Sequence, residues 1–153
     1  MKNLNLFIGI FISILFLTSC SKDKDSDNDS LVGTWKPIRE VDVCSTGSED
    51  IYEYSVCQQK SRYVFKNDGT LTINEYDDEN SSGNCIEDYS LIGTWILNEN
   101  KLTLTIAGET DTPTFFKLTS NNLKVGYYDS DANDPCDGGN LPSHYYTELV
   151  RVK

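Results

Sequence analysis

The sequence has few of the residues and motifs on which most enzymes depend. It contains a single histidine, His144, no G-x-S-x-G, no phosphate-binding glycine loop and no group of residues at metal-ligand spacing. Positive charge is also scarce, since 13 Lys and Arg face 24 Asp and Glu, a formal net charge of −11. A surface that binds nucleic acid has to be basic. We therefore expect a protein that is not an enzyme, with no catalytic residue, cofactor, metal or nucleic-acid partner.

Long hydrophobic runs are also missing, apart from one near the N-terminus. Residues 6–17 (LFIGIFISILFL) are almost wholly apolar, but a membrane-spanning helix needs about 20 residues. The run has the length of a secretory signal core. The four residues 17–20 (LTSC) that follow it resemble the lipobox of bacterial lipoproteins, which implies cleavage before Cys20 and its acylation. We expect a signal peptide at 1–19 and a palmitate-type anchor on Cys20. The alternative is an ordinary cleavable signal with a chance cysteine.

The next segment, residues 21–30 (SKDKDSDNDS), has no apolar side chain. Such a segment cannot bury enough surface to fold. We expect residues 20–30 to form a lipidated cysteine with a disordered acidic tether. Serine after Cys20 resembles the sorting signal of outer-membrane lipoproteins, and Ser21-Lys22-Asp23 weakly resembles a surface-export tag. The expected location is therefore the outer membrane of a Gram-negative bacterium, with exposure at the cell surface left open.

Helical periodicity is almost absent from residue 31 onward, where short β-rich runs alternate with turn residues. Residues 31–153 are expected to form one domain. We predict eight strands, at 31–40, 61–66, 70–76, 91–97, 101–107, 113–119, 122–129 and 144–152. The links at 67–69, 98–100 and 120–121 are tight polar turns. Antiparallel pairing places these turns at one end and the longer connections at the other. The predicted fold is all-β, an eight-stranded antiparallel up-and-down barrel with one closed end and one open end.

Several short motifs carry a resemblance to a known family. Gly33-Thr34-Trp35 matches the Gly-x-Trp that opens lipocalins, residues 65–71 read F-x-x-D-G-T-L, and a second GTW stands at 93–95. In order and spacing, about residues 31 to 152 resemble the lipocalin-like domains of bacterial lipoproteins. The resemblance implies that Trp35 lies at the closed end and that Arg151 packs across it as a cation–π partner. A solvated arginine at a frayed terminus is the alternative. The second tryptophan, Trp95, is expected at the open end.

Four cysteines remain beside Cys20. An even count in an exported chain indicates two disulfides, and a zinc site would need C-x-x-C pairs, which the sequence lacks. All four lie in connections at the open end, and three pairings are possible in principle. We predict Cys57–Cys85, because these flank the open end of the 61–76 hairpin. We predict Cys44–Cys136, because the first and last strands should meet at barrel closure.

Strand alternation predicts which side chains face the interior. The candidates for lining a ligand pocket are Tyr63, Glu75, Trp95, Ile106 and Tyr127. An apolar body with a carboxylate at its rim suits a small hydrophobic, amphipathic or cationic molecule. Alternatively, large side chains fill the barrel, and the protein is an interaction module whose disulfide-braced loops contact envelope or host proteins. In both cases we expect a monomer held on the membrane by its lipid anchor, with the open end facing away.

Overall fold

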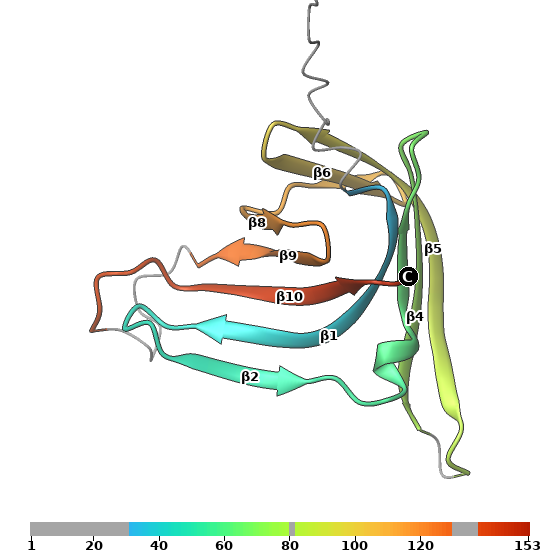
Figure 1. Cartoon of the computed structure of the whole chain (residues 1–153), viewed down its shortest axis with the longest axis horizontal. Coiled ribbons are helices and arrows are strands. Elements are labelled where there is room, and N and C mark those ends of the chain that lie inside the picture. The colour runs from blue at the N-terminus through green and yellow to red at the C-terminus, as the bar shows by residue number, and fades with distance from the viewer. Residues whose placement is uncertain (1–30, 80–81, 130–137) are drawn as a thin grey trace, which may run out of the picture.

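The computed structural model describes residues 31–79, 82–129 and 138–153, which form strands and a single 3₁₀ turn, η1 (Gln58–Lys60). The predicted signal peptide, Cys20, the tether and Cys136 lie outside the described residues. Figure 1 shows the strands, which are β1 (Gly33–Val43), β2 (Glu49–Glu53), β3 (Arg62–Phe65), β4 (Thr70–Glu79), β5 (Cys85–Asn98), β6 (Lys101–Ile106), β7 (Glu109–Asp111), β8 (Phe115–Leu118), β9 (Asn122–Tyr128) and β10 (His144–Arg151).

None of the described residues belongs to a helix with the length and apolar character needed to cross a membrane.

All strand pairs are antiparallel and belong to one curled sheet, in the order β7-β6-β5-β4-β3-β1-β10-β9-β8, with β2 paired to β1 beside this path. The first and last long strands, β1 and β10, meet in the middle, as expected for an up-and-down order. The prediction of an all-β antiparallel fold of this type is confirmed. The sheet is a half-barrel, however, because its edge strands β7 and β8 pair only with β6 and β9 among the described residues.

The structure corrects the prediction of an eight-stranded barrel in two ways. It adds the short strands β2 and β7, and among the described residues it leaves the edge strands β7 and β8 unpaired with each other, a gap that we call the open seam. Ala107 and Gly108 have positive φ values of 53° and 86° and turn the chain back on itself. The short strand β7 therefore pairs with β6, at the edge where β8 would have closed a barrel. Neither β7 (ETD) nor β2 (EDIYE) has a buried residue. Both lack the alternation of buried and exposed residues that marks a strand in sequence.

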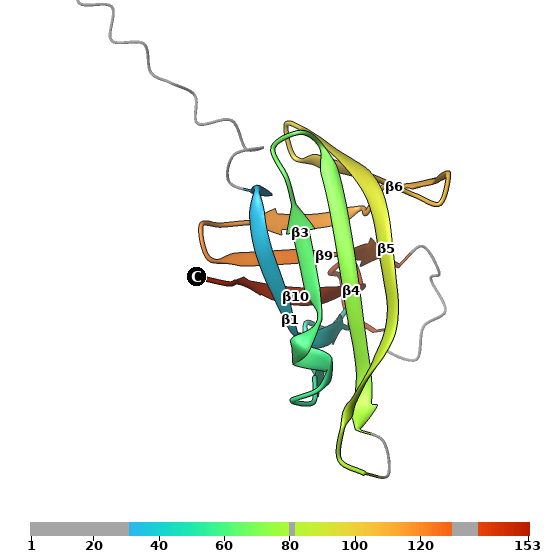
Figure 2. The same cartoon turned by 90° about the vertical axis from the view of Figure 1, so that its right-hand side faces the viewer.

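Strand β1 bends and so connects two sets of strands that cross each other. One set contains β3, β4 and β5, and the other contains β9 and β10 (Figure 2). Its first three residues pair with β3 and its last five pair with β2, while β10 follows it along most of its length. The register with β10 shifts between Pro37 and Arg39, where proline has no amide hydrogen to donate. Figure 2 shows the result: β9 and β10 run across and behind β3, β4 and β5. The space between these two sets holds the core and the cavity described below.

Most of the core lies toward the closed end, which is defined by the turns at 66–69, 98–101 and 119–122. The buried cluster there consists of Leu31, Trp35, Phe65, Leu71, Ile73, Trp95, Leu97, Leu102, Leu123 and Leu149. A smaller cluster of Val41, Phe115 and Tyr146 lies elsewhere in the sheet. The turn at 66–69 depends on Gly69, whose φ of 83° is readily adopted by glycine.

The expectation that Trp95 lies at the open end is wrong. Its indole Nε1 donates to the carbonyl oxygen of Lys66 (3.0 Å), its amide donates to the carbonyl of Gly69 (2.8 Å), and its ring packs edge-on against Phe65. Strand β5 starts at the open end and reaches the closed end at Asn98. Trp95 is three residues from that end, so both tryptophans belong to the closed-end core.

The disulfide Cys57–Cys85 is confirmed. It joins the connection after β2 to the start of β5, with 5.1 Å between the two Cα atoms. Cys57 is almost fully buried, with 1% of its surface exposed. Cys44 is also disulfide-bonded. Because Cys136 lies outside the described residues, the Cys44–Cys136 pairing stays a prediction.

Candidate functional site

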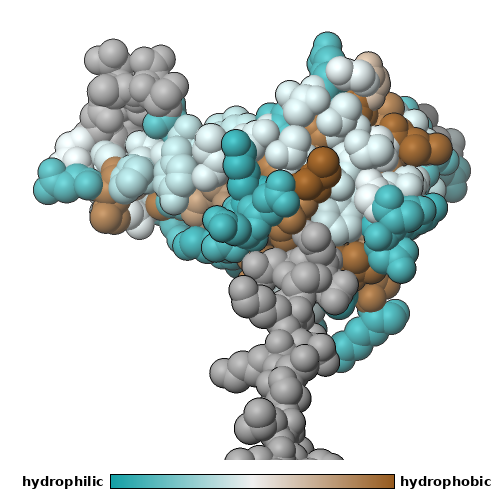
Figure 3. All heavy atoms as spheres, turned by 90° about the horizontal axis from the view of Figure 1, so that it is seen from above, coloured by the Kyte–Doolittle hydropathy of each residue, from teal (hydrophilic) through white to brown (hydrophobic). Residues whose placement is uncertain are grey.

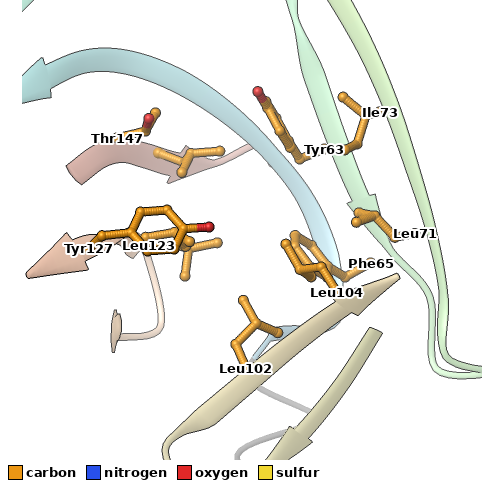
Figure 4. A pocket seen from close by; sticks show the side chains of 11 residues that line it. Tyr63, Phe65, Leu71, Ile73, Leu102, Leu104, Leu123, Tyr127 and Thr147 are labelled. Carbon is orange, nitrogen blue, oxygen red and sulfur yellow. The ribbon is translucent and has the colours of Figure 1, made fainter. Parts of the chain in front are cut away.

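An apolar cavity of about 200 Å³ lies between the two sets of strands. Its walls are Tyr63, Phe65, Leu71, Ile73, Leu102, Leu104, Leu123, Val125, Tyr127, Thr147 and Leu149. Figure 4 shows the side chains of β3 and β4 on one side, those of β9 and β10 on the other, and the two leucines of β6 beneath them. The interior is therefore not completely filled by its own large side chains.

The alternation of the strands explains why these residues face the cavity. In β3, β4, β6 and β9 the lining residues are two apart, as in Leu102 and Leu104 or Leu123 and Val125, and every second side chain of a strand points to the same face. The intervening positions are occupied by Val64, Thr72, Thr103, Lys124 and Gly126. Strand β10 contributes Thr147 and Leu149 by the same rule.

A second cavity of about 240 Å³ adjoins the first, because Tyr63 and Thr147 line both. Its remaining lining residues are mostly polar: Pro37, Glu40, Tyr54, Gln58, Ser61, Glu75, Tyr76, Asp77 and Asp88. They come from β1, β4, β5 and the connection around η1. The two cavities together form one amphipathic site, which we call the joined cavity.

Tyrosine hydroxyls donate hydrogen bonds to the two glutamates of the polar part. The Tyr63 hydroxyl donates a hydrogen bond to Glu75, and the Tyr54 hydroxyl donates to Oε1 of Glu40 at 2.8 Å. Burial raises the pKa of Tyr63 well above its ordinary value, and the charge of Glu75 raises it further. The pKa of Tyr54 is raised by burial and by its hydrogen bond to Glu40. Both phenols therefore stay protonated at neutral pH and act as neutral donors.

The structure places the five predicted lining residues in four different surroundings. Tyr63 and Tyr127 line the apolar part, and Glu75 lines the polar part next to Tyr63. Ile106 packs against the closed-end core. Trp95 lines a separate hollow beside Gly69. The hydroxyl of Tyr127 on β9 donates to Asp111 of the edge strand β7, so it connects β9 to β7 across the open seam.

Sequence reasoning missed Thr147, Tyr54 and Ser61 as lining residues. Thr147 lies on β10, where Tyr146, Glu148 and Leu149 are all buried and obscure the alternation. Tyr54 belongs to the connection between β2 and β3, for which the sequence gives no periodic signal. Ser61 begins the predicted strand 61–66 and stands two residues before Tyr63, so alternation could have identified it. His144 lies apart from the joined cavity and stacks on Phe115, with 4.4 Å between ring centroids. The described residues contain no group of three or more His, Cys, Asp and Glu arranged to hold a metal ion.

The residues of the Gly-x-Trp motif meet Arg151 at the closed end. The Arg151 guanidinium carbon lies 4.2 Å from the Trp35 ring centroid. Its Nε donates to the carbonyl of Ser120 (2.6 Å) and its Nη1 to the carbonyl of Val32 (2.7 Å). A Cβ on Gly33 would lie 2.3 Å from that Nη1. Glycine at this position therefore leaves room for the arginine.

Comparison with known proteins agrees with this geometry. A family described as a lipocalin-like domain matches residues 31–125, more than half of the chain. The chain belongs to this family. Its lipocalin-like domain resembles the crystal structure of a lipocalin-like protein from Bacteroides uniformis ATCC 8492, with 9% identity, a TM-score of 0.46, and coverage of 80% of this chain and 99% of that one.

A second solved structure, an uncharacterized protein from Bacteroides eggerthii DSM 20697, has 11% identity and a TM-score of 0.46, with coverage of 79% of this chain and 98% of that one. No curated protein matches the chain.

Proposed function

We propose that this lipocalin-like domain binds a small hydrophobic or amphipathic molecule in the joined cavity, without catalysis and as a monomer. The observation that carries the proposal is the apolar cavity of about 200 Å³, lined almost wholly by hydrophobic side chains and adjoined by a polar one. Ligand sites are typically concave, mostly apolar and supplied with a few polar groups that orient the ligand.

The volumes limit the size of the ligand. An engineered apolar cavity of roughly 150 Å³ holds a benzene molecule, so the apolar part alone admits one ring or a short alkyl chain. Sites for drug-sized ligands measure roughly 300–1,000 Å³, which is reached here only when the polar part is included. We therefore infer a compact ligand with an apolar tail and a polar head.

We further propose that Cys20 is acylated and holds the chain on the outer membrane of a Gram-negative bacterium. The lipobox-like residues 17–20 support this. Leu31, the first described residue, belongs to the closed-end core and accepts a hydrogen bond from the Trp35 indole. A tether that enters there would leave the open end facing away from the membrane. If a Cys20→Ala variant still fractionates with membranes, the anchoring proposal fails.

A cavity-filling variant tests the binding proposal. Val125→Phe places a larger side chain in the apolar part, and the matched control Ile92→Phe makes a similar enlargement on the outer face, where Ile92 is 73% exposed. We expect native mass spectrometry of the full-length protein from its own envelope to detect a bound small molecule. The same experiment should find it with Ile92→Phe and not with Val125→Phe. Equal occupancy in the two variants would contradict the proposal.

One feature favours the second candidate, a protein-interaction module. All five residues of β2 are exposed, including Ile51 and Tyr52, and β2 pairs only with β1 among the described residues. A strand of this kind offers free backbone groups to a partner strand. On the face seen in Figure 3, however, hydrophobic residues form small separate groups among hydrophilic ones. Partner capture that depends on β2, together with an empty cavity, would favour this candidate.

A further inference from the structure

We propose that the polar part of the joined cavity binds a cationic head group, a primary amine or quaternary ammonium, of an amphiphile whose tail lies in the apolar part. This inference rests on the proposed function and specifies the chemical class of the ligand. It stands on the shape of the joined cavity, the charge of its polar walls and the aromatic rings beside them.

The charge of the polar part is of one sign. Among the described residues, its walls include four acidic residues and no lysine, arginine or histidine; the acidic residues are Glu40, Glu75, Asp77 and Asp88. The ion pairs within the described residues involve only Glu53 and Glu148, which bind Arg39 and Lys124. The acidic groups of the cavity therefore have no protein cation as an ion-pair partner in the described part of the chain. A ligand cation would supply that missing charge.

The hydrogen bonds in the polar part position these acids without neutralising them. The Tyr63 phenol donates to Glu75 and the Tyr54 phenol donates to Glu40. The Tyr89 phenol also hydrogen-bonds Glu75, and none of these phenols carries a charge. Each phenol donates to a carboxylate oxygen, and the lone pairs of the carboxylate that remain can accept hydrogen bonds from an ammonium group. Tyr63, Tyr54 and Tyr76 also bring aromatic rings to the wall. Aromatic rings attract ammonium groups through cation–π interaction.

The joined geometry determines how such a ligand would lie. Tyr63 and Thr147 border both parts, and Figure 4 shows them on opposite walls of the apolar cavity, both above Leu102 and Leu104. A tail between Leu102, Leu104 and Val125 would therefore bring its head group past the Tyr63 hydroxyl toward Glu75. An anionic head group in the same pose would face like charge, which disfavours binding.

Three probes with the same tail and different head groups separate charge from hydrophobicity: n-octylamine, 1-octanol and octanoate. Their affinities for the full-length protein are measured by isothermal titration calorimetry, with Val125→Phe as the blank for nonspecific uptake. We expect octylamine to bind at least about tenfold more tightly than octanoate, with octanol between them. A tenfold difference corresponds to about 1.4 kcal/mol.

Two variants test whether the acidic groups of the cavity cause the preference for the amine head group. Glu75→Gln removes a charge but can still accept the Tyr63 hydrogen bond, and should bring the ratio of octylamine to octanol affinity close to one. Glu109→Gln removes an exposed charge of β7 and should keep that ratio. Equal binding of the three probes, or an unchanged ratio in Glu75→Gln, would overturn the cationic head group and leave the proposed function standing. Failure of all three probes to bind the wild-type protein would overturn both.

Discussion

Replacing Arg151 with methionine removes the polar contacts at the closed end while keeping most of the apolar stem. The guanidinium donates to two backbone carbonyls and lies over the Trp35 ring. A hydrogen bond to a charged group contributes about 1.5–3 kcal/mol when buried, and a cation–π contact about 0.5–2 kcal/mol. Arg151 is half-buried, so these values are reduced. We expect Arg151→Met to lower the free energy of unfolding by about 2–4 kcal/mol, a large part of a typical total of 5–15 kcal/mol.

Urea denaturation followed by tryptophan fluorescence measures this change. The midpoint should fall while the slope of free energy against urea stays the same. Arg151→Lys should be intermediate, because an ammonium group lacks the planar fork that reaches both carbonyls. Lys153→Met removes an exposed charge two residues away and should change stability by less than about 0.5 kcal/mol. If Arg151→Met matched this control, the arginine would be a solvated residue of a frayed terminus.

Gly33→Ala provides an independent check on the same contact. The added Cβ would meet the Arg151 Nη1 at 2.3 Å, and Gly33 has a φ of 145°. Alanine should therefore destabilise the protein both through backbone strain and by displacing the guanidinium. In an Arg151→Met background only the backbone strain remains. The double variant should therefore lose less free energy of unfolding than the sum of the losses in the two single variants.

Two further predictions concern the disulfide and the response to acid. Cys57 and Cys85 are 28 residues apart, and the chain-entropy model gives a loss of about 3.6 kcal/mol for the double serine variant; a urea midpoint unchanged from wild type would refute this. Burial alone would raise the pKa of Glu148, but hydrogen bonds from Arg39 and Asn122 hold that pKa below its ordinary value. Its stabilising effect is therefore present above about pH 4.5 and lost as the pH falls through the lowered pKa. In urea titrations, the free energy of unfolding should fall more between pH 6 and pH 3 for the wild type than for Glu148→Gln. An equal fall in the two proteins would contradict this.

The sequence predicted the parts of the fold that depend on local pattern. The strands with alternating residues, such as β3, β4 and β9, and the turn at Gly69 lie where alternation and turn chemistry indicate. The Cys57–Cys85 pairing followed from the order of the strands. Strands β2 and β7 escaped prediction because all their residues are exposed.

The candidate site was predictable only in part, for physical reasons. Alternation indicates that Tyr63, Tyr127 and Glu75 face the interior, but the volume left between their side chains depends on the bend of β1 at Pro37 and on the open seam beside β7. Trp95 was misplaced because its depth along β5, rather than its face, decides which end it occupies. Thr147 and Tyr54 join the site through tertiary packing, which leaves no periodic trace in the sequence.

The most direct test of the central claim is an NMR titration of the methyl groups of the full-length protein with 1-octanol. If the apolar cavity is the binding site, the methyl signals of Leu102, Leu104 and Val125 should shift and saturate together. The outer-face methyl signals of Ile92 and Ile96 should stay in place. Shifts confined to the outer face, or no saturable shift in the cavity, would contradict the proposal that this lipocalin-like domain binds a small molecule in its interior.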